Sequence, residues 1–185
     1  LYALPNGGEG CTVLGGYSLD EAAQTNAVAV YGIEAKNVYA VPGGLFLTDT
    51  RSVSAESRRM SDSMGDYTEY VELLCTDLFR FDYDASGIRP AASGVVSGLL
   101  PERSAIAPFG SGYVCLSEVS GSYINMYVGK GGPAPAAEQT GSALYTLDAA
   151  LTVTAKLSKL PNGDGILWAG FMPETVLLSG ENGSC

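Results

Sequence analysis

Residues 142–172 (SALYTLDAALTVTAKLSKLPNGDGILWAGFM) limit the fold more than any other part of the chain. Residues 151–157 (LTVTAKL) alternate between apolar and polar side chains, which predicts a strand with one face in solvent. Residues 161–165 (PNGDG) predict a tight turn, and residues 166–169 (ILWA) predict a more buried strand. Short strands joined by tight turns are typical of sandwiches, barrels and propellers.

Similar patterns recur upstream. Residues 37–41 and 45–48 flank Pro42-Gly43-Gly44, which predicts a hairpin. Residues 12–19 predict a strand that Gly15-Gly16 interrupts with a bulge or a close backbone contact. We count about a dozen short strands, no long helix and about three repeats of a four-strand pattern. The sequence therefore predicts an all-β fold of short antiparallel meanders.

Two segments lack the strand pattern. Residues 50–66 are polar and rich in serine, and they predict a loop or an insertion. Residues 129–141 (GKGGPAPAAEQTG) predict a loop rich in Gly, Pro and Ala. We expect one domain over residues 1–185, and the opening LYALP suggests a segment of a longer protein.

The charge balance excludes several partners. The net charge of −10 argues against nucleic acid, which is normally bound by a basic surface, and against docking on an anionic membrane. No apolar run is long enough to cross a bilayer, so we expect a chain that is not embedded in a membrane.

Three segments, taken in order, carry a resemblance to a known family. They are residues 11–48, where a strand leads to VYGIEAKNVYAVPGGLFLT, residues 76–100 (TDLFRFDYDASGIRPAASGVVSGLL), and residues 142–172. The chain resembles the bacterial exported proteins with a C-terminal β-propeller domain, which are distantly similar to WD40 propellers. It departs from the family pattern at Gly170 and Pro173.

The resemblance covers residues 11–172 apart from the loops and implies a partial β-propeller of about three blades. A β-sandwich is the alternative fold. The resemblance also implies a secreted or cell-surface location, and it supplies no catalytic residues. A partial propeller would leave open sheet edges, through which copies of the chain could associate.

The four cysteines, Cys11, Cys75, Cys115 and Cys185, show no metal-site spacing. Four cysteines allow three complete pairings, and the sequence does not choose among them. Cys75 and Cys115 lie within strand patterns, which favours buried free thiols. If a disulfide forms, we expect it between these two residues.

The sequence points to no catalytic, cofactor or metal site. The chain contains no histidine, which excludes Ser-His-Asp and Cys-His catalysis and histidine metal ligands. Glu69, Glu72, Asp82 and Asp84 are candidates for paired catalytic carboxylates, but strand and turn positions explain them better.

Three further sets of residues have both a structural and a functional interpretation. Asn162 and Asp164 resemble a fragment of a calcium loop and are weak metal candidates, although Asn-Gly and Asp-Gly are ordinary turn pairs. Trp168 is the only tryptophan, and its apolar run predicts a core position rather than a platform for a ligand. The arginines in the polar segment, Arg51, Arg58 and Arg59, predict a solvated loop rather than a contact patch.

These observations lead to a first hypothesis, a non-catalytic binding module for a protein or glycan of the cell envelope. We expect its site at one end of the blades, where propellers bind. One alternative is a polysaccharide hydrolase or lyase with paired carboxylates, and another is a sensory domain in envelope regulation. A pocket holding two acids would favour the enzyme.

Overall fold

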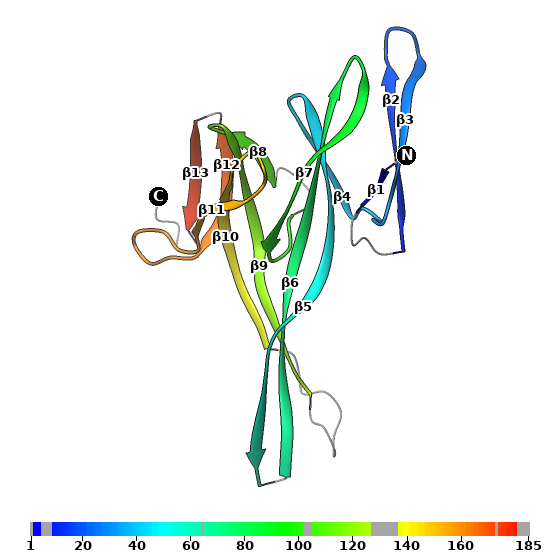
Figure 1. Ribbon diagram of the computed structural model, residues 1–185. Helices are drawn as coiled ribbons and strands as arrows, with labels where there is room; N and C mark the ends of the chain where they lie inside the picture. Colours follow the sequence, from blue (N-terminus) through cyan, green and yellow to red (C-terminus); the bar gives the residue numbers. More distant parts are fainter. Residues whose placement is uncertain are drawn as a thin grey trace.

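The computed structural model describes residues 2–4, 9–63, 65–101, 105–126, 137–172 and 174–180. All regular secondary structure in these residues is β-strand, so the all-β prediction is confirmed (Figure 1). The strands are β1 (Tyr2–Ala3), β2 (Cys11–Ser18), β3 (Ala23–Tyr31), β4 (Asn37–Val41), β5 (Gly44–Asp62), β6 (Gly65–Asp84), β7 (Gly87–Ser97), β8 (Ile106–Phe109), β9 (Gly112–Met126), β10 (Ala137–Leu147), β11 (Val153–Leu157), β12 (Ile166–Met172) and β13 (Thr175–Gly180).

Two groups of four consecutive strands form antiparallel meanders, β4 to β7 and β8 to β11. Within each group every strand pairs with the next one along the chain. The β4–β5 hairpin is the one predicted: Val41 pairs with Gly44, and Gly43 at its tip has a φ of 75°. Glycine suits that position because it adopts positive φ without strain.

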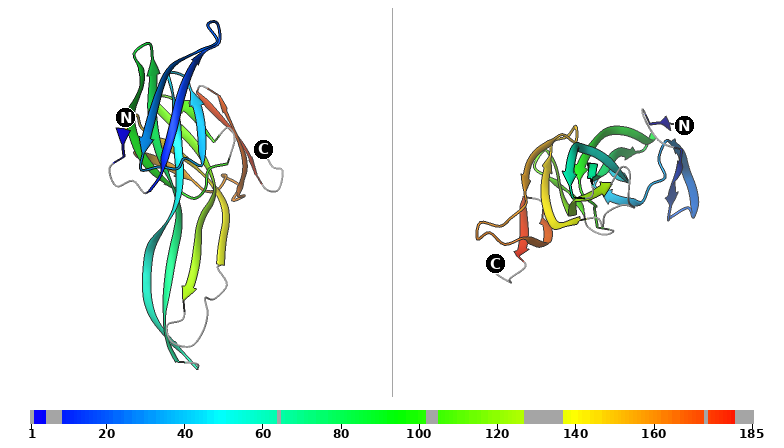
Figure 2. Two further views of the ribbon diagram at one scale, coloured as in Figure 1. Left: turned by 90° about the vertical axis from the view of Figure 1, so that its right-hand side faces the viewer. Right: turned by 90° about the horizontal axis from the view of Figure 1, so that it is seen from below.

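Two hairpins flank these meanders. β2 and β3 form an antiparallel pair with a bulge opposite Gly16 and Tyr17, but its extra residue, Thr25, lies in β3 and not in β2, where Gly15-Gly16 predicted it. The short β1 runs parallel to β3 on the edge away from β2. β12 and β13 form a separate two-stranded sheet. In the view from below in Figure 2, the two hairpins lie at opposite ends of the molecule.

The β2–β3 hairpin, the two meanders and the β12–β13 hairpin pack face to face in chain order. Three buried clusters join them. Between β2–β3 and β4–β7 lie Leu14, Val30, Ile33, Leu47, Phe81 and Ile88. Between β4–β7 and β8–β11 lie, among others, Tyr39, Phe46, Leu78, Val96, Tyr113, Cys115, Tyr145 and Leu151. Between β8–β11 and β12–β13 lie Val114, Leu116, Leu144, Ile166 and Ala169, with Phe171, Val176 and Leu178 beside them.

Adjacent residues of one strand show how this packing arises. Phe46 and Leu47 of β5 are both fully buried, yet Phe46 belongs to the cluster on one face of the meander and Leu47 to the cluster on the other. Successive side chains of a strand point to opposite faces, so a strand covered on both faces needs a continuous apolar run. The run LFL supplies one.

Four strands continue beyond the stack and form what we call the arm: residues 52–62 of β5, 65–74 of β6, 118–126 of β9 and 137–142 of β10 (Figures 1 and 2). Here β6 pairs with β9, with Tyr70 opposite Ile124. This pairing joins the two meanders into one eight-stranded sheet of order β11-β10-β9-β6-β5-β4, from which β7 and β8 branch.

The arm corrects two loop predictions. Residues 50–62 belong to β5, and β6 begins at Gly65, so the loop expected at residues 50–66 is wrong for these residues. A ladder is built from backbone N–H and C=O groups, so a polar segment can pair with the β-prone strand beside it. Residues 137–141 likewise belong to β10, whereas the rest of the loop predicted at residues 129–141 lies outside the described residues.

The alternating residues 151–157 behave differently from the prediction. The strand is shorter than expected, and all five residues of β11 are exposed, so the predicted buried face is absent. Leu151, which precedes the strand, is instead buried between the two meanders. Among the residues described, none forms a helix long and apolar enough to span a membrane.

Candidate functional site

The acidic residues proposed as a catalytic pair fall into two groups that do not converge, so that Asp82 and Asp84, two residues apart on β6, are the pair left to consider. Glu69, Glu72, Asp82 and Asp84 all lie on β6. At about 3.3 Å per residue, Glu69 and Asp82 stand roughly 40 Å apart along the strand. A carboxylate pair for glycoside hydrolysis needs a separation of about 5–9.5 Å. One extended strand therefore keeps the two groups of acids apart.

Asp82 and Asp84 are each engaged by an arginine. Arg80 Nη2 lies 2.7 Å from Asp82 Oδ1, and Arg89 forms an ion pair with Asp84 at the β6–β7 turn. Hydrogen bonds donated by the Ser86 hydroxyl and backbone lower the pKa of Asp84, and Arg89 lowers it further. This carboxyl group is held in its ionised form, which is unsuitable for a general acid.

Arg80 connects the two meanders. Its guanidinium carbon lies 5.0 Å from the centroid of the Tyr113 ring on β9. The Tyr113 ring in turn meets Phe46 of β5 edge to face, with centroids 4.9 Å apart. A cation over an aromatic face is an attractive contact, and here both partners belong to the protein itself. Burial raises the pKa of the Tyr113 hydroxyl, in keeping with a packing role.

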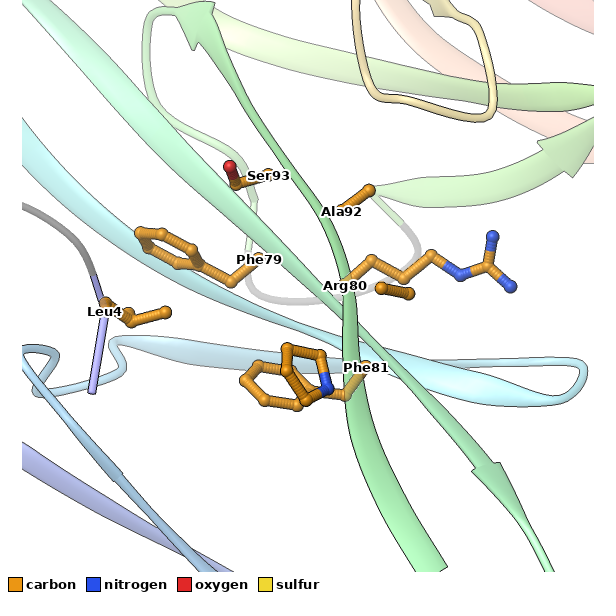
Figure 3. A pocket seen from close by; sticks show the side chains of 8 residues that line it. Leu4, Phe79, Arg80, Phe81, Ala92 and Ser93 are labelled. Carbon is orange, nitrogen blue, oxygen red and sulfur yellow. The ribbon is translucent and has the colours of Figure 1, made fainter. Parts of the chain in front are cut away.

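An apolar pocket of about 230 Å³ lies where β1 approaches β6 and β7 (Figure 3). It is lined by Leu4, Phe79, Arg80, Phe81, Pro90, Ala91, Ala92 and Ser93. In Figure 3 the Arg80 side chain points away from Phe79 and Phe81, as strand alternation requires. The pocket is smaller than the usual range of about 300–1,000 Å³ for small-molecule sites, and no acidic residue lines it.

The weak calcium candidates form a turn. Asn162 donates its side-chain amide to Asp164 Oδ2 at 3.0 Å, and its Oδ1 accepts the Asp164 backbone N–H at 3.1 Å. The Asn162 oxygen is thus used within the turn between β11 and β12. No group of three or more potential metal-ligating side chains occurs in the described part of the chain.

The arm is anchored at its base by polar contacts. Arg51 forms two hydrogen bonds to Asp77, at 2.6 and 3.1 Å, so this arginine is paired and lies on a strand rather than in a loop. The hydroxyl groups of Thr76 and Ser117 donate to the carbonyl oxygens of Gly98 and Ser97, at 2.6 and 2.7 Å. These bonds hold the start of the β7–β8 connection between β6 and β9. The side chains of Arg58 and Arg59 lie outside the described residues.

Trp168 is exposed, so the prediction that it belongs to the core is wrong. Its side of β12 faces away from the stack, because Ala169 and Phe171 occupy the positions that pack on β8–β11. Trp168 is 55% exposed, Met172 45% and Leu177 49%. Leu177 pairs with Gly170, which lies between the other two on the same face. We call these three residues the β12–β13 outer face.

The hairpin at the other end of the stack has a matching surface. Val13, Tyr17 and Tyr31 are 68%, 66% and 47% exposed, and they share the face of β2–β3 that is turned away from β4–β7. We call these three residues the β2–β3 outer face. Neither surface was predicted, because both parities of these strands are apolar and the sequence does not say which one the stack covers.

The structure describes three free cysteines, two of them buried and one exposed. Cys75 and Cys115 are free and buried, as predicted, while Cys11 is free and exposed. Burial raises the pKa of Cys75, and it raises the pKa of Cys115 to about 12. Cys185 lies outside the described residues.

No family model, curated protein or solved structure matches this chain.

Proposed function

We propose that the chain is a partial β-propeller that serves as a non-catalytic binding module of a secreted or cell-surface bacterial protein. Its ligand is a protein or a glycan of the cell envelope. Two consecutive four-stranded meanders packed face to face support the propeller arrangement, since such meanders are the blades of propellers. The location rests on the family resemblance alone.

The arm is the observation that carries the binding role. It extends from one end of the stack, where we expect the binding site, and brings strands of both meanders into one sheet. Among the described residues, the outer strands of that sheet, in β5 and β10, keep one edge without a partner in the arm. Unpaired backbone groups at a sheet edge can bind a further strand or hydrogen-bond a sugar.

The enzyme alternative has less support. The candidate acids are spread along β6, and Asp82 and Asp84 are neutralised by arginines. The pocket in Figure 3 is apolar and brings no pair of acids together. A binding surface formed by strands needs none of these groups.

A truncated arm tests the proposal. Ser52 pairs with Leu74, so replacing residues 53–73 with Asn-Gly would close β5 and β6 with a two-residue turn. The matched control replaces Ala85-Ser86 with Asn-Gly at the β6–β7 turn, at the opposite end of β6. The probes are isolated bacterial cell walls and an array of envelope polysaccharides.

We expect the intact chain and the control to bind a probe without releasing new sugar ends, and the truncated chain to bind at least about tenfold more weakly. Equal binding by all three proteins would contradict a site on the arm. Release of reducing or unsaturated sugar ends would instead establish the enzyme.

A further inference from the structure

The two end hairpins occupy complementary strand positions in the stack. The first strand of one complete meander, β4, lies beside the first strand of the other, β8. The fourth strands, β7 and β11, also lie beside each other. β12 lies beside both β8 and β10, and its contact with the first strand β8 gives β12 and β13 the first and second positions of their sheet. β3 lies beside β7, which gives β2 and β3 the third and fourth positions. Each hairpin is therefore half of a meander, and each supplies the half that the other lacks.

The edges that would join these halves are free. Among the described residues β13 pairs only with β12, and β2 pairs only with β3. The other edge of β3 already carries β1. If β13, with β12 beside it, paired with the open edge of β2, the strand order would be β12-β13-β2-β3. The first, second, third and fourth strands would then follow one another, as they do in the two complete meanders.

The exposed apolar residues lie where the missing strands would pack. In the part of the chain that the structure describes, no sheet lies over the β12–β13 outer face or the β2–β3 outer face. Val38 on β4 is 54% exposed, because it faces the side where β2–β3 lacks its first strand. Leu157 on β11 is 38% exposed. It pairs with Leu144 and so faces the β12–β13 hairpin, which among the residues described has no fourth strand to cover it.

Charge does not oppose this contact. Between residues 11 and 31 the only charged side chains are Asp20 and Glu21, which lie in the turn between β2 and β3. Between residues 166 and 180 the only one is Glu174, between β12 and β13. The two hairpins are thus free of charge along their strands in a chain with a net charge of −10.

We propose that two copies of this chain associate head to tail, with β13 of each copy pairing antiparallel to β2 of the other. The inference rests on the propeller arrangement proposed above. Two complete meanders and two halves amount to three four-stranded sheets per chain. Propellers typically have about 4–8 blades, so residues 1–185 alone supply too few sheets for a closed ring, whereas two copies of these residues give six. The ring has two identical contacts and no open hairpin.

The mass in solution and the fluorescence of Trp168 test this assembly together. Trp168 is the only tryptophan, and it lies on a surface that the second copy would cover. We expect a mass twice the 19.2 kDa of the chain by light scattering. We also expect an emission maximum that moves to longer wavelength when dilution separates the copies.

Lysine substitutions locate the contact. Val13→Lys and Leu177→Lys each place a charge on an outer face, and each should convert the dimer into a monomer with exposed Trp168. Ser111→Lys, at the exposed β8–β9 turn, adds the same charge away from both hairpins and should leave the dimer intact. Circular dichroism and a cooperative unfolding transition confirm that each variant remains folded.

A cross-link tests the pairing even if the lysine variants do not fold. β5 and β6 are the second and third strands of a complete meander, and Gly44 at the start of β5 lies opposite Asp82 near the end of β6. In the completed sheet β13 and β2 would be the second and third strands. Thr175 at the start of β13 should therefore lie near Ser18 at the end of β2. With Cys11 and Cys185 replaced by serine, a Ser18→Cys chain and a differently tagged Thr175→Cys chain should form a mixed disulfide. Neither variant should cross-link to itself.

A monomer at all concentrations, a dimer that survives both lysine substitutions, or an open-ended polymer would each overturn the closed ring. The arm truncation is measured by binding to the envelope probes, and the assembly is measured by mass. A monomer that still binds through its arm would refute only the assembly, and a dimer that binds no envelope probe would refute only the function.

Discussion

The indole ring of Trp168 lies against Gly170, its neighbour two residues along the outer face of β12. A Cβ atom on Gly170 would stand 2.9 Å from Cζ3 of the ring and nearer still to Cη2. The other end hairpin repeats the arrangement, because a Cβ atom on Gly15 of β2 would stand 3.1 Å from Cε2 of Tyr17. In each hairpin an aromatic side chain covers a glycine that would otherwise leave the strand bare.

This contact predicts the effect of Gly170→Ala. The added methyl group must push the indole ring aside, and we expect a loss of about 1 kcal/mol in the free energy of unfolding together with a changed tryptophan emission. The control is Gly141→Ala on β10, where a Cβ atom would meet nothing within 4 Å. A stabilised Gly170→Ala variant with unchanged emission would refute the contact.

Gly94→Ala should be more damaging, because the obstacle is backbone. A Cβ atom at Gly94 of β7 would stand 2.7 Å from Cβ of Leu151 and closer to the Leu151 carbonyl oxygen. Leu151 itself has a φ of 66°, so its backbone is already constrained. We expect a loss of roughly 2–3 kcal/mol in urea unfolding. A loss no greater than that of Gly141→Ala would show that the two meanders do not meet at this point.

The buried Cys115 thiol predicts a loss of stability in alkali. Its pKa is raised from 9.0 to about 12 by burial, so between these pH values the unfolded chain releases a proton that the folded chain retains. This stability is fully present below pH 9 and is lost as the pH rises toward 12. At pH 11 the loss is roughly 2–3 kcal/mol.

The comparison protein is Cys115→Ala, in which the titrating group is gone. Its free energy of unfolding should fall less between pH 8 and pH 11 than that of the unaltered protein, even if it is lower at pH 8. The same fall in both proteins would mean that Cys115 is not buried in the folded state.

Thiol labelling separates the cysteines by exposure. Iodoacetamide at pH 8 should modify Cys11 within minutes, whereas Cys75 and Cys115 should react only after denaturation, because both are buried and their pKa values are raised. Peptide mass spectrometry identifies the modified sites. A Cys75–Cys115 disulfide in the native protein would contradict the structure.

Local signals predicted some parts of the fold well. The β4–β5 hairpin follows from Pro42-Gly43-Gly44, whose turn chemistry needs no distant partner. Gly15-Gly16 marked the right place but the wrong strand, because the extra residue of the bulge is Thr25 of β3, opposite Gly16 and Tyr17. The arm could not be found in this manner, because its polar strand in β5 is held by backbone bonds to β6 and by the contact of β6 with β9.

The surfaces were harder to predict than the strands. Trp168 lies in a run in which both parities are apolar, so periodicity cannot say which face the stack covers. For β11 the opposite error occurred, because residues 151–157 alternate as a half-buried strand should, yet all five residues of β11 are exposed. In both cases burial is decided by how many strands the adjacent sheet contains, which is a property of the tertiary structure.

A crystal structure of the protein tests the central claim most directly. We expect six four-stranded sheets around one axis, two of them completed by β13 of one copy and β2 of the other, with Trp168 buried in the contact. Two sheets packed as a sandwich, or end hairpins whose outer faces remain in solvent, would contradict it.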